Sequence, residues 1–422
     1  MNAIPFISVL LVSFLLSACG DNSCKTPVDD NASTALKTTA FYADNEHNII
    51  DVIDVDKMQL ITTLSTGHKD THTAGIALNT KDSTKLYVSN RHDNYIDVID
   101  THLDNIIQSI HLNFYPRSIN VENDTSLVEV ASTNKPVAAI IDAKSDSVLA
   151  TVGDLSKTVT NKCGHPYWLN SEDFVFIDRE NKKIYTYNIK KINGTWVTKK
   201  INELDTPSPV HHIATPNING KRNYNASVFY AMAEGDSTHY PSVLKLDFNK
   251  TTGLDINETL KLTKNGVDVA DIGGHHLNFL KDGKTLYAGS KEGDLFVVDY
   301  SSSPMKIIKT IPVGKGAGHT VEMKDQNLAV IINHNDTFIS FIDTALNKKI
   351  ADIEVSHLTK EQAAKVQVQS HTSYYFSPDG RYFYLFLTEE GDMVKVDLLA
   401  QKVVNRLHLG GKLQMGSFIH SH

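Results

Sequence analysis

A recurring phrase constrains the fold of this 422-residue chain more than any other feature of its sequence. An aliphatic segment that ends in Ile-Asp or Val-Asp is followed by a short polar turn and then by a second aliphatic segment. Two copies, Ile49–Asp54 and Tyr95–Asp100, share the run Ile-Asp-Val-Ile-Asp. Further copies end at Asp142, Asp299, Asp343 and Asp397. Each copy predicts a β-hairpin with an Asx-type turn.

A second pair of strands precedes each of these hairpins. It is clearest around Asp282-Gly283 and Asp379-Gly380, where Asp-Gly marks a hairpin turn between aliphatic and aromatic segments. Four antiparallel strands in a unit of about 40 to 50 residues are typical of a β-propeller blade. A helical pattern is expected only at Thr359–Lys365. The sequence therefore predicts an all-β chain, a single β-propeller spanning residues 41–422.

The number of blades follows from the starts of the innermost strands. These are expected near Thr73, Pro116, Pro166, His212, Leu277, Thr320, Thr372 and Ser417. The last start leaves no room for a full blade, whereas the first hairpin at Phe41 lacks an innermost strand. The C-terminal segment Met415–His420 should therefore complete the N-terminal blade and remove the exposed sheet edge. Eight blades are favoured, with seven as the alternative because boundaries between Asn170 and Leu262 are blurred.

The N-terminus carries a targeting signal. Residues 1–18 are mostly apolar and too short to span a membrane as a helix. Their end, Leu16-Ser17-Ala18-Cys19, resembles the lipobox of bacterial lipoproteins, which implies diacylation of Cys19. Gly20 resembles the residue that follows this cysteine in outer-membrane lipoproteins. We expect a polar tether over 19–40 and a lipid-anchored protein of the periplasm or cell surface, with the outer membrane favoured.

Charge and cysteine content narrow the choice of partners. The net charge is −8 and the basic residues are dispersed, so nucleic acid is not an expected partner. Besides Cys19, the thiols are Cys24 and Cys163. An oxidising periplasm would permit a disulfide between these two. A thiol ligand at Cys163 is the alternative.

Nineteen histidines are the most unusual component of the sequence. The loops that enter the innermost strands and the loops that join second to third strands lie on one face of a propeller. Fifteen histidines are expected there, and His102, His111, His357 and His408 elsewhere. The residues that begin innermost strands converge on the central axis, so imidazoles distant in sequence can meet around one ion. The candidate metal ligands are His72, His165, His212, His276, His319, His371 and His420.

Imidazole-rich coordination suits zinc first, with copper as the alternative. The seven methionines do not cluster, which argues against a thioether site for Cu(I). The competing interpretation of any single histidine is a structural hydrogen-bond partner within its blade. The loop histidines His47, His92, His239 and His334 are expected to be solvated surface residues.

Two levels of family resemblance support this interpretation. Leu86–Asn90 followed by Tyr95–Asp100 resembles YVTN-type and cytochrome-cd1-like propeller repeats, which implies the fold alone. The motifs around His165, His212, His276 and His371 resemble those of periplasmic zinc metallochaperone propellers that serve zinc ABC transporters. The resemblance implies zinc binding by these four histidines and transfer to a solute-binding protein. The histidine-rich N-terminal tail of that family is missing.

A non-catalytic role in metal delivery or storage is the preferred hypothesis. One alternative is a propeller oxidoreductase with a copper or haem centre, although Cys-x-x-Cys-His is absent. No Gly-x-Ser-x-Gly or phosphate-binding glycine loop points to another enzyme class. The other alternative is a propeller that binds a protein or glycan and whose histidines are incidental.

Overall fold

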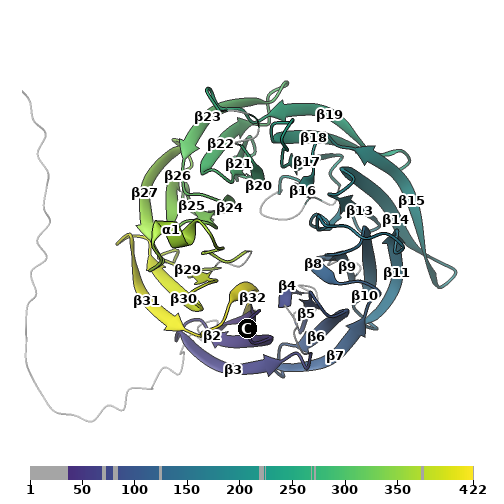
Figure 1. Cartoon of the computed structure of the whole chain (residues 1–422), viewed down its shortest axis with the longest axis horizontal. Coiled ribbons are helices and arrows are strands. Elements are labelled where there is room, and N and C mark those ends of the chain that lie inside the picture. The colour runs from purple at the N-terminus through teal and green to yellow at the C-terminus, as the bar shows by residue number, and fades with distance from the viewer. Residues whose placement is uncertain are drawn as a thin grey trace, which may run out of the picture. The chain divides into compact units, whose positions relative to one another are not determined.

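The computed structural model shows a ring of eight four-stranded antiparallel sheets (Figure 1). The structure describes residues 37–68, 73–78, 84–122, 126–217, 223, 225–267, 269, 272–371 and 375–421. Seven sheets consist of four strands consecutive in sequence, and one joins the two ends of the described chain. The eight-bladed propeller favoured by the sequence is confirmed.

Blades are numbered here in chain order, and each is given from its innermost strand outward. Blades 1 to 4 consist of the following strands: β32 (Leu413–Ser421), β1 (Lys37–Asp44), β2 (Ile49–Asp54), β3 (Gln59–Ser65); β4 (Thr73–Leu78), β5 (Lys85–Asn90), β6 (Tyr95–Asp100), β7 (Asn105–His111); β8 (Pro116–Glu122), β9 (Leu127–Ser132), β10 (Val137–Asp142), β11 (Ser147–Gly153); β12 (Tyr167–Trp168), β13 (Asp173–Asp178), β14 (Lys183–Ile192), β15 (Thr195–Asp205). Blades 5 to 8 consist of these: β16 (Val210–Ala214), β17 (Val228–Ala233), β18 (Ser242–Asn249), β19 (Gly253–Lys261); β20 (Gly274–Phe279), β21 (Thr285–Ser290), β22 (Asp294–Asp299), β23 (Lys306–Pro312); β24 (Ala317–Glu322), β25 (Leu328–Asn333), β26 (Phe338–Asp343), β27 (Lys348–Glu354); β28 (Tyr375–Phe376), β29 (Tyr382–Leu387), β30 (Asp392–Asp397), β31 (Lys402–His408).

The repeated aspartates end the third strands because they form the next turn. In blade 1 the carboxylate of Asp54 accepts a hydrogen bond from the backbone N–H of Lys57 (3.0 Å). Asp343 and Asp397 make the same type of bond to Leu346 and Leu399. The carboxylate thus satisfies a turn N–H that the ladder leaves unpaired.

The ring closes through its C-terminal strand, as the sequence predicts. β32 pairs antiparallel with β1, with Ala40 opposite Phe418 and Tyr42 opposite Gly416. Because β1 begins at Lys37, residues 37–40 belong to the blade and not to the tether. The polar side chains of this segment hid its strand character, since Thr38 is buried through a hydrogen bond to Tyr375 rather than by apolar contact.

The apolar core lies between adjacent blades. One cluster joins Tyr87 and Val98 of blade 2 to Val130 and Ile141 of blade 3, and similar clusters join later neighbours. The second and third strands are buried on both faces, which explains their continuous aliphatic runs, whereas the outermost strands alternate with exposed residues.

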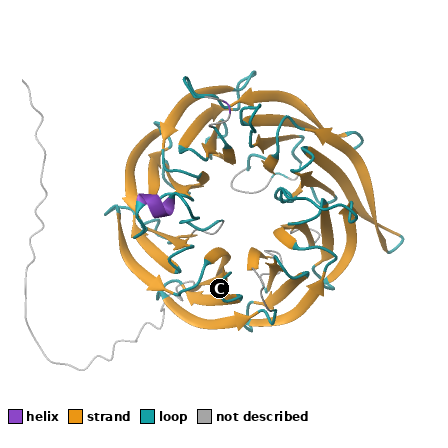
Figure 2. Cartoon of the chain, in the orientation of Figure 1, coloured by secondary structure: helices purple, strands orange, loops and turns teal. Residues whose placement is uncertain are grey.

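Little of the described chain is helical (Figure 2). α1 (Lys360–Ala363) lies within the predicted segment, and its capping box joins Thr359 and Gln362. No helix among the described residues is long and apolar enough to cross a membrane. The leader, Cys19 and residues 19–36 of the tether lie outside the described residues.

Candidate metal centre

A repeated β-bulge directs side chains toward the axis of the ring. In β16, Val210 pairs with Ala233 and Ile213 with Ala231, so one extra residue is accommodated at His211-His212. The same shift occurs at His275-His276 in β20 and at Gly318-His319 in β24. A bulge releases its residues from the ladder and re-aims their side chains. Figure 1 shows these strands bordering the centre of the ring.

Five consecutive blades contribute to one group of imidazoles, which we call the histidine cluster. It contains His165, His211, His212, His275, His276, His319, His334 and His371. His165 precedes β12 and His371 precedes β28, yet their ring centroids lie 6.3 Å apart. Loops of blades 4 and 8 therefore meet next to the inner strands of blades 5 to 7.

Two sets within the cluster have the compactness of a metal site. In the first, one ligand atom each of His165, His211, His276 and His371 lies within 4.8 Å of all the others. The second set consists of His275, His334 and His371 under the same limit. Because both sets contain His371, they overlap, and the first has the four imidazoles that a tetrahedral ion takes up.

One pair of ring nitrogens already has the separation of two metal ligands. Nε2 of His276 and Nε2 of His371 lie 3.4 Å apart. With zinc–nitrogen bonds of about 2.0–2.1 Å, two ligands of a tetrahedral ion are about 3.3–3.4 Å apart. The pair can thus bind one ion with little movement of the two rings.

Hydrogen bonds fix which nitrogen of several rings faces the cluster. Nδ1 of His211 donates to Oε1 of Glu234 (2.8 Å), and Nδ1 of His334 donates to the carbonyl oxygen of Gln369 (3.0 Å). In both rings Nε2 is buried and has no hydrogen-bond partner among the described residues. Nε2 of His165 is likewise buried and unpartnered. An acceptor on one nitrogen that leaves the other bare is the usual arrangement of a metal-binding histidine.

Burial keeps the cluster neutral. It lowers the pKa of His212 and of His334 to about 4, and that of His275 to about 3. Burial and repulsion from neighbouring imidazoles hold the pKa of the other five rings well below the usual range of histidine. Neutral imidazole is the form that binds a metal, so the site is ready for an ion at neutral pH.

Close approach of the rings also explains one glycine. A Cβ at Gly318 would lie 2.5 Å from Nε2 of His334 and 3.2 Å from Cε1 of His275. Any other residue in this bulge would push the second set of imidazoles apart.

The structure brings five of the seven predicted ligands into the cluster. These are His165, His212, His276, His319 and His371. Nδ1 of His212 is buried without a partner, but its Nε2 bonds to the carbonyl of Leu277 (3.3 Å), and it belongs to neither compact set. His72 and the side chain of His420 lie outside the described residues.

Sequence reasoning missed three members of the cluster. His211 and His275 were passed over for the second histidine of each pair, although a bulge points both members inward. The prediction that His334 is solvated is wrong, since only 3% of it is exposed. Its position in the sequence could have indicated burial, because it directly follows the buried strand β25. Its backbone N–H donates to the carbonyl of Gly316 (3.1 Å).

Cys163 does not join the metal sets. Its thiol is buried between blades 3 and 4, where Sγ bonds to the carbonyl of Lys135 (3.3 Å). Burial raises the pKa of this thiol to about 12, so the thiolate that a metal requires is strongly disfavoured. The partner in the predicted disulfide, Cys24, lies outside the described residues.

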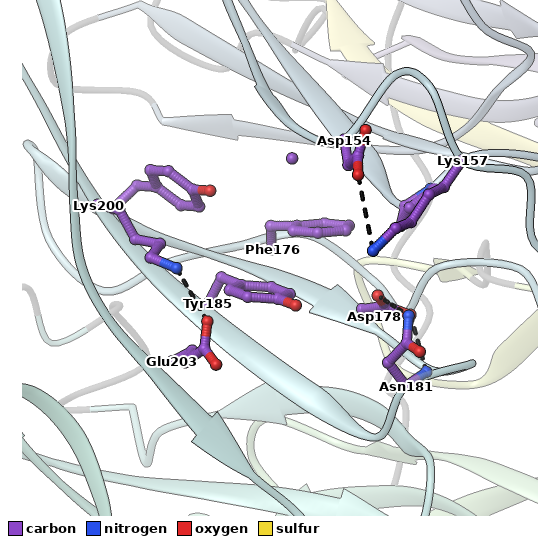
Figure 3. Close-up of a pocket in the computed structure, with 11 residues that line it drawn as sticks. Asp154, Lys157, Phe176, Asp178, Asn181, Tyr185, Lys200 and Glu203 are labelled. Carbon is purple, nitrogen blue, oxygen red and sulfur yellow. Dashed lines mark hydrogen bonds and ion pairs between the residues drawn. The ribbon is translucent and has the colours of Figure 1, made fainter.

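A cavity of about 270 Å³ lies away from the cluster, on the outer strands of blades 3 and 4 (Figure 3). Phe176 and Tyr185 stack within its wall, with ring centroids 5.5 Å apart. Its lysines are paired inside the same wall, Lys157 with Asp154 and Lys200 with Glu203. These pairs leave no unpaired lysine among the residues that line this cavity.

Replacing Glu234 by Gln should weaken metal binding, because the neutral amide holds the ring of His211 less firmly and no longer raises its basicity. We expect a loss of about 10- to 100-fold in zinc affinity, measured by chelator competition. Arg179, which donates to both oxygens of Glu234, would lose an ionic partner as well.

Two control variants separate these effects of Glu234→Gln. Arg179→Gln breaks the ion pair but leaves the bond from Glu234 to His211, so its zinc affinity should fall less. Glu203→Gln removes an exposed ion pair and should bind like the wild type. Equal affinities in all three variants would show that Glu234 does not orient a ligand.

Comparisons with known proteins place the fold. No family model and no curated protein matches the sequence. Among solved structures, dihydro-haem d1 dehydrogenase NirN, in complex with DHE, matches with a TM-score of 0.65 and 15% identity over 91% of this chain and 74% of that chain. AztD from Citrobacter koseri matches with a TM-score of 0.60 and 12% identity over 92% of this chain and 99% of that chain. Saccharomyces cerevisiae Sqt1 matches with a TM-score of 0.63 and 11% identity over 88% of this chain and 90% of that chain.

These identities are too low to carry a function, so the likeness shows the fold alone. At that level the comparisons agree with the β-propeller that the sequence predicts.

Proposed function

We propose that this propeller binds one divalent transition-metal ion, zinc in preference to copper, as cargo for delivery or storage. The observation that carries the proposal is the pair His276 and His371, whose Nε2 atoms lie 3.4 Å apart inside a buried set of four imidazoles. Hydrogen bonds orient the neutral rings, and Nε2 of His165, His211 and His334 has no partner among the described residues. Histidines at incidental positions would not share these properties.

The residues that would hold the ion are His165, His211, His276 and His371. The ion would supply positive charge and Lewis acidity. The protein holds the rings neutral by burial and orients them through acceptors such as Glu234. Nothing in this arrangement requires a reaction, so we favour a carrier over an enzyme.

The test is a metal titration of the body from Lys37 onward, purified without a histidine tag and stripped of metal. Zinc is added in competition with a chelator of known affinity, and Cu²⁺ in a parallel series followed by electron paramagnetic resonance. We expect one tightly held zinc ion per chain, because the two sets share His371. Preference for copper would favour the oxidoreductase alternative, and a protein that retains neither ion would leave a protein- or glycan-binding propeller.

Delivery would require an anchor and a partner. We propose that Cys19 attaches the propeller to a membrane of the periplasm or to the cell surface, with the outer membrane favoured. The proposed recipient is the solute-binding protein of a metal ABC transporter. The lipobox and the motif resemblance to zinc metallochaperone propellers support this part of the proposal.

A further inference from the structure

A second cavity, of about 260 Å³, adjoins the histidine cluster. His165 and His371 form part of its wall, so it opens directly onto the proposed metal site. The remaining wall contains Arg91, Arg117 and Lys162, together with neutral residues. None of the described residues that line this cavity is acidic.

Among the described residues, the positive charges in this cavity have no acidic partner in an ion pair. Among the described residues no ion pair involves Arg91, Arg117 or Lys162, and Nε of Arg91 is buried without a hydrogen-bond partner. Arg117 donates from Nη1 to the carbonyl of Cys163. Arg179, whose charge also acts on Arg117, is by contrast paired with a carboxylate, since its Nη2 lies 2.6 Å from Glu234. The pocket of Figure 3 likewise pairs its own lysines.

The position of Arg117 in its strand places it at the axis of the ring, next to this cavity. In β8 the ladder shifts between Pro116 and Ile119, at the same point as in the strands that carry the paired histidines. Arg117 thus occupies in blade 3 the bulge position that His211 and His275 occupy in blades 5 and 6. The bulge turns its guanidinium inward, where burial and the neighbouring Arg91 lower its pKa to about 9.

We propose that this cavity binds a small polyvalent oxyanion, an organic carboxylate or inorganic phosphate. Guanidinium groups match both ligands through paired N–H donors, and the grouped cations are costly to desolvate without a counter-charge. The volume lies just below the range of drug-sized ligands, which favours a small ion. The four proposed metal ligands are neutral, so a divalent ion would add to the same excess positive charge.

Anion binding does not require the metal; only the expectation that the two ligands reinforce each other rests on the proposed function. An anion in this cavity would lie beside His165 and His371 and offset the charge of the ion that they bind. The anion would then stabilise the loaded carrier.

The test is isothermal titration calorimetry of the metal-free protein from Lys37 onward. Succinate and inorganic phosphate are titrated separately, each in a chloride buffer. We expect one site for at least one of these anions. Arg117→Gln and Arg91→Gln should each weaken binding at least about tenfold. Arg381→Gln, which removes an exposed arginine in the turn between β28 and β29 that does not line the cavity, should not. Succinate binding would identify a carboxylate ligand and phosphate binding a phosphate ligand.

Two results would overturn the inference: no uptake of either anion at millimolar concentration, or equal affinity in the wild type and both arginine variants. If Arg117→Gln fails to fold, as judged by circular dichroism, Lys162→Gln at the exposed edge of the cavity serves instead. Zinc titration of the same samples keeps the two sites separate. Zinc binding without anion binding would overturn this inference alone, and the reverse would overturn the proposed function alone.

Discussion

A variant in which His276 and His371 are both replaced by alanine should lose tight zinc binding. These residues supply the two ring nitrogens that lie 3.4 Å apart, and His371 belongs to both compact sets. Removing them leaves His165 and His211 of the first set, too few to hold an ion against a chelator. We expect zinc affinity to fall by more than about 100-fold, beyond the effect of losing an outer hydrogen bond.

The control for this variant removes the same number of histidines elsewhere. His102 and His408 are exposed and lie on turns and outer strands, so the double alanine variant of these residues should bind zinc like the wild type. A second pair, His275→Ala with His334→Ala, asks which set is used. It should reduce affinity less than the first pair, because the four-imidazole set stays intact.

The double variant also tests the structural interpretation. If the cluster merely braces the blades, zinc affinity in the variant should equal that of the wild type while the melting temperature falls. Tight zinc binding that survives the loss of His276 and His371 would rule out the proposed site.

Acidification should destabilise the metal-free protein strongly. In the folded state burial holds the pKa of His212 and His334 near 4 and that of His275 near 3, whereas unfolded histidine titrates near 6.5. Below pH 6.5 the unfolded chain therefore takes up protons that the folded chain does not, so the free energy of unfolding falls with pH. Each of these three residues should cost about 2 kcal/mol between pH 8 and pH 5.

Three carboxyl groups whose pKa is raised act in the opposite direction but are outnumbered. Burial and the nearby Asp44 raise the pKa of Asp51 to about 7, so its protonation stabilises the folded state as pH falls. Asp97 and Glu322 are shifted in the same direction by burial. Three such carboxyl groups are fewer than the eight buried imidazoles, so the free energy of unfolding should fall overall as the pH falls.

Urea denaturation at pH 8, 6.5 and 5 measures this effect. The metal-free wild type should lose stability steeply below pH 6.5, and the variant lacking His276 and His371 should lose less. Zinc at about 100 times its dissociation constant should add about 2.7 kcal/mol at pH 8 and less at pH 5, because protons compete for the rings. Stability that does not change between pH 8 and pH 5 would mean that the cluster is not buried as a neutral group.

The sequence by itself determined the architecture of this protein. The repeated Ile-Asp and Val-Asp segments reveal the hairpins of the blades, because alternating strands and aspartate turns depend only on residues that are adjacent in the sequence. Closure by the C-terminal strand was also predictable, since eight innermost strands and one incomplete N-terminal sheet leave a single arrangement without a free edge. The approach of histidines near the starts of innermost strands also followed from topology.

Only the tertiary structure decided which histidines meet. The sequence singled out the second histidine of each pair, whereas the bulges at His211-His212 and His275-His276 turn both rings toward the axis. His334 looked like a loop residue, yet packing against Gln369 of a later loop buries it. Nothing in the sequence indicated a role for Arg117 in ligand binding, because the cavity that it lines is formed by segments far apart in the sequence. A sequence pattern reflects neighbouring residues only, whereas the burial of a side chain and the charges around it depend on how all eight blades pack together.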